Sequence, residues 1–126
     1  MVLTNMSQLD LLKQLKDQLI IFFDELIELL PGEPDLIIVR IFLKDKIPVE
    51  TIMKYMKDKL VPLKQLVKDK DDTFFLQNNI LFEEIDTNKV NHFKKLWESK
   101  KLDKENKETM WKWFRSFIYL AEKYKG

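Results

Sequence analysis

The side chains best suited to catalysis or metal binding are few in this sequence, and they lie far apart. Of its 126 residues one is histidine, His92, and none is cysteine. Zinc needs three or four thiolate, imidazole or carboxylate ligands held together, so the usual zinc-binding set is missing. Ser7, Ser99 and Ser116 lack the glycine-flanked turn that exposes a serine nucleophile, and His92 is the only imidazole that could activate one of them.

Acidic residues are plentiful, but their spacing does not indicate a metal loop. They gather in three short clusters: Asp24, Glu25 and Glu28; Asp71 and Asp72; and Glu83, Glu84 and Asp86. None of these has the Asp-x-Asp-x-Asp-Gly pattern that wraps calcium, whereas charged clusters are ordinary on exposed helix faces. With two glycines, Gly32 and Gly126, the chain also lacks a glycine-rich phosphate loop. We therefore expect no catalytic residues, no cofactor and no metal, and the protein is not expected to be an enzyme.

The elements that must position these residues are predicted to be helices, because glycine is rare and strand signals are scarce. Ser7 can cap a first helix through the amide of Asp10, and Pro31-Gly32 ends it. The run Leu36–Leu43 is apolar on nearly all sides, which predicts the most buried element of the fold. That run could also be a central strand; we favour a helix, because no second strand is available to pair with it.

Proline and capping residues mark three further helices. Pro48 opens one that Pro62 should break or kink, and Thr87 can cap the next. Asp103 can cap a last helix that runs to about Tyr124 and faces inward through Met110, Phe114, Phe117, Ile118 and Ala121. In the connection between them, Thr73–Leu76 is expected to form one turn, and Ile80–Phe82 is expected to pin the segment to the core. The predicted fold class is all-α, an irregular bundle of about five helices.

Composition predicts one domain that spans residues 1–126. Hydrophobic residues make up 45% of the chain and aromatic residues 12%, which is ample for a core at this length. Without cysteine the chain is compatible with a reducing compartment. The N-terminus lacks the pattern of a secretory signal, and acidic residues interrupt the most apolar stretch, Leu19–Leu30. We expect an intracellular protein with no membrane span.

Charge is distributed unevenly along the chain although the net charge is only +1. Residues 1–86 hold 11 basic and 16 acidic residues, and residues 87–126 hold 11 basic and 5 acidic residues. The basic final third also contains aromatic residues, a mixture that could hold phosphates and stack bases. The candidate phosphate contacts are Lys94, Lys95, Lys100, Lys101, Lys104, Lys107 and Lys112. The competing interpretation, that the aromatic residues fill a core while the lysines stay solvated, is the stronger of the two.

Two tryptophans in the last helix indicate a protein-binding surface. Trp111 and Trp113 lie about 200° apart around a helix, so one buried face cannot hold both of them. An exposed indole beside Arg115 is typical of a residue that anchors an interface. The candidate interaction surface is therefore Trp111, Trp113, Arg115 and Tyr119. A protein partner is expected, and nucleic-acid binding through the lysines is the alternative.

Several segments carry a resemblance to a viral group. They are Ile47–Met53, Leu60–Lys64, Asp72–Asn79, Lys89–Trp97, Leu102–Phe114 and Phe117–Tyr124. Over residues 45–125 the chain resembles uncharacterised small helical proteins of large nucleocytoplasmic DNA viruses, the mimivirus-like and algal-virus group, with residues 1–44 expected to be N-terminal helices packed on that part. The resemblance implies a protein made in infected cells, located in the host cytoplasm or nucleus or packaged in the virion. It brings no catalytic residues with it.

Overall fold

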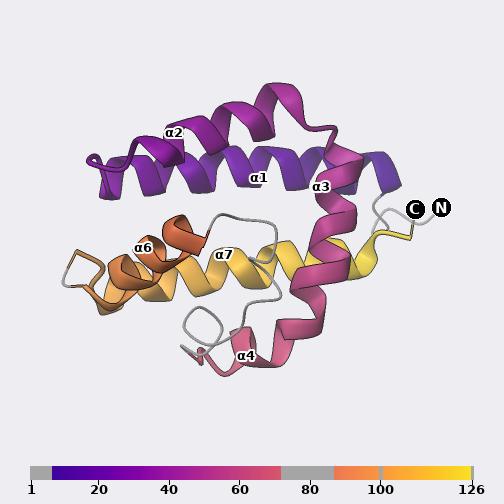
Figure 1. The fold of residues 1–126 in the computed structure, drawn as a ribbon. Coiled ribbons are helices and arrows are strands. Elements are labelled where there is room, and N and C mark those ends of the chain that lie inside the picture. The colour runs from indigo at the N-terminus through magenta and orange to yellow at the C-terminus, as the bar shows by residue number, and fades with distance from the viewer. Residues whose placement is uncertain (1–6, 72–86, 100, 126) are drawn as a thin grey trace.

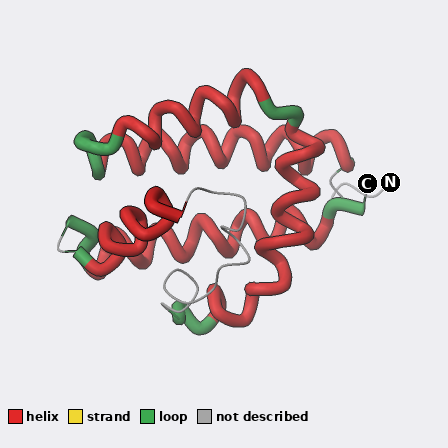
Figure 2. Tube along the Cα trace, in the orientation of Figure 1, coloured by secondary structure: helices red, strands yellow, loops and turns green. Residues whose placement is uncertain are grey.

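The structure is a computed structural model, and it describes residues 7–71, 87–99 and 101–125. These residues form five continuous helical segments. They contain no strand, and most of the tube in Figure 2 has the colour of a helix. The predicted all-α class is confirmed, including the preference for helix over strand at Leu36–Leu43. The predictions for Thr73–Leu76 and Ile80–Phe82 lie outside the described residues.

The first two segments form an antiparallel pair. Helix α1 (Gln8–Leu29) begins where Ser7 was expected to cap it, with the Asp10 amide donating to Ser7 Oγ at 3.0 Å. Helix α2 (Pro34–Ile41) follows the Pro31-Gly32 turn and continues into a π-helical turn, η1 (Phe42–Lys46). The Arg40 guanidinium donates to Asp24 at 2.6 Å, which ties the second half of α2 to α1.

The third segment crosses the end of this pair (Figure 1). Its helical type changes along its length. Its parts are α3 (Val49–Tyr55), a π-helical turn η2 (Met56–Leu60), a 3₁₀ turn η3 (Val61–Leu63) and α4 (Lys64–Lys68). Pro62 lies in the 3₁₀ turn. A proline inside a helix has no N–H to donate and clashes with the preceding turn, so the α-helical pattern is interrupted there as predicted.

The last two segments are α6 (Thr87–Glu98) and α7 (Lys104–Lys123). The predicted cap of α7 is present as a capping box, in which Asp103 Oδ1 accepts from the Asn106 amide at 2.8 Å and Asn106 Oδ1 accepts from the Asp103 amide at 3.3 Å. Helix α7 runs antiparallel to α1, and α4 packs on it as well. It is therefore the central helix, with neighbours on several sides.

A single hydrophobic cluster joins the described helices. At its centre Phe22 of α1 contacts three aromatic residues of α7, with ring centroids 5.6 Å from Phe114, 5.5 Å from Phe117 and 6.1 Å from Trp113. Fully buried side chains come from α1, α3, α4 and α7, namely Leu11, Leu15, Met53, Val67 and Phe117. The α1–α7 contact thus organises the core.

The expectation that Leu36–Leu43 is the most buried element is wrong. Leu36 is the only residue of α2 that is buried, at 4% exposed. Helix α2 lies at the outside of the bundle and packs on α1 (Figure 1). A helix with a neighbour on one side can bury only that side, so an apolar sequence that continues around the helix leaves apolar residues in solvent.

Candidate interaction site

The surface of α2 that faces away from α1 is the main apolar surface of the described structure. Its residues, which we call the outer face of α2, are each between 38% and 50% exposed: Ile37, Ile38, Val39, Ile41 and Phe42. Ile38, Ile41 and Phe42 are spaced three and four residues apart, so their side chains lie together on one side of the helix. Neighbouring side chains at this spacing make one patch rather than scattered positions.

The size of this patch separates it from ordinary exposed apolar residues. Five large side chains that are about half exposed present on the order of 400 Å² of apolar surface, and the largest apolar patch of a monomeric protein, commonly about 300–600 Å², is often a binding site. Leu9 offers a contrast within the same chain. It is 74% exposed on α1, and its exposed neighbours among the described residues are polar or charged: Gln8, Asp10 and Lys13.

Trp111 does not belong to any surface, and the candidate interaction surface predicted from the last helix is wrong at this residue. Its side chain is 3% exposed and its ring lies 5.4 Å from that of Trp97 on α6, centroid to centroid, in an edge-to-face contact. The prediction would hold for a helix with one buried face. Because α7 is central, Trp111 packs toward α6 and Trp113 packs toward α1, so the two indoles have separate neighbours.

Trp113 lies at the edge of the core, where it is partly buried. Its indole Nε1 donates to the Glu25 carboxylate of α1 at 2.7 Å, and its ring stacks on Phe117 at 6.0 Å. The other two members of the predicted surface, Arg115 and Tyr119, are exposed, and Tyr119 retains 50% of its area. These two side chains lie together on the opposite side of α7, next to α4.

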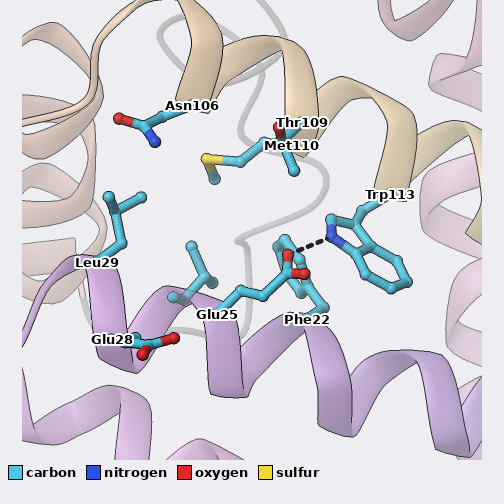
Figure 3. Close-up of a pocket in the computed structure, with 9 residues that line it drawn as sticks. Phe22, Glu25, Glu28, Leu29, Asn106, Thr109, Met110 and Trp113 are labelled. Atoms are coloured by element: carbon cyan, nitrogen blue, oxygen red, sulfur yellow. Dashed lines mark hydrogen bonds between the residues drawn. The ribbon is translucent and has the colours of Figure 1, made fainter.

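A cleft of about 370 Å³ lies between α1 and the first half of α7 (Figure 3). Figure 3 shows Glu25 and Leu29 pointing from α1 toward α7, and Met110 pointing back from α7. Apolar side chains form most of the lining, and carboxylates stand at its rim: Phe22, Glu25, Leu26, Glu28, Leu29, Asn106, Thr109, Met110 and Trp113. The cleft could accommodate a small apolar group, with the acidic side chains favouring a cation. No sequence spacing pointed to it, because its two walls are more than 70 residues apart.

The lysines predicted as phosphate contacts are not all in one place. Lys104 and Lys112 are exposed on the same side of α7 as Arg115, because residues 104, 112 and 115 recur at helical spacing. Lys107 is directed elsewhere, with its Nζ 5.1 Å from the centre of the Trp97 ring. Lys94, Lys95 and Lys101 are exposed or partly exposed outside this row, and Lys100 lies outside the described residues.

The charges around Glu108 identify the basic side of α7. Lys70, which follows α4, donates to the Glu108 carboxylate at 2.6 Å, and this hydrogen bond is the main reason why the pKa of Glu108 lies below its ordinary value. The positive charges of Lys70, Lys104 and Arg115 lower that pKa further. Two cations of α7 and one that follows α4 therefore act on one carboxylate.

His92 is paired with a carboxylate. Its Nε2 lies 2.7 Å from Glu33 Oε2, which links α6 to the turn before α2. Across residues 7–71, 87–99 and 101–125, no group of three or more histidine, aspartate or glutamate side chains is placed to hold a metal ion. In the same ranges no helix has both the length and the apolar character needed to cross a bilayer.

Comparisons with protein-family models, with curated proteins and with solved structures found no match for this chain.

Proposed function

We propose that this chain is a non-catalytic helical protein that binds another protein through the outer face of α2. The observation that carries the proposal is the exposure of five neighbouring apolar residues, four on α2 and the fifth, Phe42, at the start of η1. An apolar helix face laid against an apolar surface of a partner is a common mode of protein recognition. Protein binding is also what the sequence predicts, but the binding surface proposed here lies on α2 and not on the last helix.

The energetics of such a contact are favourable for a reversible complex. Removing about 400 Å² of apolar surface from water is worth roughly 10 kcal/mol before other terms. Lost translational and rotational freedom and side-chain ordering offset a large part of that gain. The patch is thus large enough to supply the central apolar contact of an interface, and polar residues around it would complete the contact area.

The proposal includes a structural or regulatory adaptor role in a virus-infected cell, which rests on the resemblance of residues 45–125. A viral adaptor needs a folded scaffold and a binding face but no reactive centre. The scaffold here is the α1–α7 pair, and α2 is held on it by Leu36 and by the Arg40–Asp24 ion pair, which leaves the opposite side of the helix for a partner.

The test compares two variants that remove exposed apolar side chains. In the first, Ile38→Ser and Ile41→Ser are combined; in the second, Leu9→Ser removes an even more exposed apolar residue outside the patch. Tagged proteins are isolated from the cells that make them, and co-purifying proteins are quantified by mass spectrometry. We expect one or more partners to fall about tenfold with the α2 variant and to persist with Leu9→Ser. Equal recovery from both variants contradicts the proposal.

A further inference from the structure

A second concave surface lies on the other side of the molecule, between α4 and the second half of α7. It is a groove of about 550 Å³ lined by Lys64, Gln65, Lys68, Arg115, Ile118, Tyr119, Glu122 and Lys123. Four of these residues are cations and one is an anion. In Figure 1, α2 and α4 lie on opposite sides of the α1–α7 pair, so this groove is separate from the outer face of α2.

The acidic residue of the groove is already neutralised by one of its own lysines. Lys64 Nζ donates to Glu122 Oε2 at 2.9 Å. Lys68 and Arg115, in contrast, make no ion pair with any carboxylate in the part of the chain that the structure describes. The groove therefore presents two cations that form no ion pair among the described residues, Lys68 and Arg115, on the same concave surface as Lys123.

The positive surface continues along α7 beyond the groove. Lys104, Lys112, Arg115 and Lys123 lie on one side of the helix, since at about 100° per residue they fall within roughly 100° of one another around its axis. The 19 residue steps from Lys104 to Lys123, at about 1.5 Å each, make this row about 28 Å long. Lys70 joins it through its hydrogen bond to Glu108. We call these cations and those of the groove the basic stripe: Lys64, Lys68, Lys70, Lys104, Lys112, Arg115 and Lys123.

The shape of this surface favours a chain of phosphates over a single phosphate group. One phosphate needs two or three donors, and a guanidinium such as that of Arg115 can hold it through two hydrogen bonds. The remaining cations extend along the helix, where only a ligand with repeated charges can reach them. The ring of Tyr119 is half exposed in the groove, with Lys123 Nζ 4.9 Å from its centre. An exposed ring among cations suits the stacking of a nucleobase.

From this arrangement we propose that the basic stripe binds single-stranded nucleic acid, with Lys68 and Arg115 contacting phosphates and Tyr119 stacking against a base. The site is independent of the protein-binding function proposed for α2, and either can hold without the other. Of the seven lysines predicted from sequence as phosphate contacts, Lys104 and Lys112 belong to it.

The experiment measures fluorescence anisotropy of labelled oligonucleotides of about 15 residues, which is within the range covered by small single-strand binding folds. Oligo(dT), oligo(U), a duplex of equal length and a poly-glutamate peptide are titrated with the full chain at about 50 mM salt and above. We expect both single strands to bind more tightly than the duplex or the peptide. The affinities for oligo(dT) and oligo(U) are compared to establish whether the chain prefers DNA or RNA.

Matched double variants locate the site. Lys68→Glu with Arg115→Glu removes the two cations that form no ion pair among the described residues, and Lys13→Glu with Lys54→Glu makes the same charge change at exposed positions on α1 and α3. The first is expected to weaken binding at least tenfold and to reduce the slope of log affinity against log salt by about 1.4, from two lost contacts. The second is expected to weaken binding less than about threefold. Tyr119→Ala is expected to cost about fivefold or more.

Four results overturn the proposal: no binding of either single strand at about 50 mM salt, equal weakening by the two double variants, tighter binding of the duplex, or equal binding of poly-glutamate. All of the substituted side chains are solvent-exposed. Thermal unfolding of each variant establishes that it is folded before its affinity is compared.

Discussion

Two alanine substitutions in α2 should differ sharply in their effect on stability, although they lie two residues apart. Leu36 is 4% exposed and packs on α1, whereas Ile38 is 50% exposed on the outer face. Leu36→Ala removes buried methyl groups and leaves a cavity, a change that costs on the order of 2–4 kcal/mol of unfolding free energy. Ile38→Ala removes a side chain that is half in water, and alanine favours the helix by a few tenths of a kcal/mol. Its expected cost is about 1 kcal/mol or less.

The assay is urea unfolding followed by circular dichroism at a low micromolar protein concentration, so that the monomer determines the midpoint. Both variants should retain the slope of free energy against urea, because neither changes much of the surface exposed on unfolding. The difference between the two unfolding free energies is the quantity of interest, and it should exceed about 1 kcal/mol. Repeating the measurement at a tenfold higher protein concentration separates monomer stability from self-association.

Equal destabilisation by the two substitutions would refute the reasoning. It would mean that the outer face of α2 is covered within the monomer, and the apolar patch would no longer need a partner. A larger cost for Ile38→Ala than for Leu36→Ala would additionally mean that α2 is rotated relative to α1.

Three other predictions concern α7 and its neighbours. Asp103→Ala removes the capping box and should lower the unfolding free energy by about 1 kcal/mol, measured by urea unfolding; no change would contradict the cap. Glu108 should titrate below an ordinary glutamate in carboxyl NMR spectra, and Lys70→Met should raise its pKa, because the main cause of the lowered pKa is the hydrogen bond from Lys70. Since the folded pKa is the lower one, this carboxylate stabilises the fold above the ordinary pKa, and that stabilisation is lost as pH falls through the lowered value. In Glu25→Ala the indole N–H resonance of Trp113 should shift and exchange faster with solvent; an unchanged resonance would mean that the hydrogen bond is absent.

The helix boundaries could be predicted from sequence because local chemistry determines them. Ser7 and Asp103 cap helices through hydrogen bonds that span three residues, and Pro62 interrupts a helix wherever it occurs. Such signals need no knowledge of the rest of the fold. The same locality explains why the helical class could be recognised at all.

The exposure of α2 could not be predicted because it depends on how many neighbours the helix has. The apolar run in Leu36–Leu43 indicates burial by composition, and nothing within the run indicates that α1 is its main neighbour among the described helices. The prediction that the last helix exposes one of its indoles, Trp111 or Trp113, failed for the opposite reason. Helix α7 has neighbours on several sides, so side chains 200° apart are both covered, one fully and the other in part.

The basic stripe could be predicted only in part. Lys104 and Lys112 are visible in the lysine-rich final third of the sequence, but Lys64 and Lys68 come from a segment about 50 residues earlier, in the half of the chain that is acidic overall. Antiparallel packing of α4 on α7 brings them beside Arg115. The charge balance of a sequence segment does not determine the charge of a surface that several segments share.

The measurement that tests the central claim most directly is site-specific photo-cross-linking from the outer face of α2. A photoreactive amino acid is placed at Ile38 and, in a second protein, at Leu9, and both are irradiated in the cells that make the protein. We expect a discrete cross-linked protein from position 38 and none from position 9. Mass spectrometry then identifies the cross-linked protein as a partner or as a second copy of this chain. The absence of an adduct at position 38, or the same adducts from both positions, would contradict this expectation.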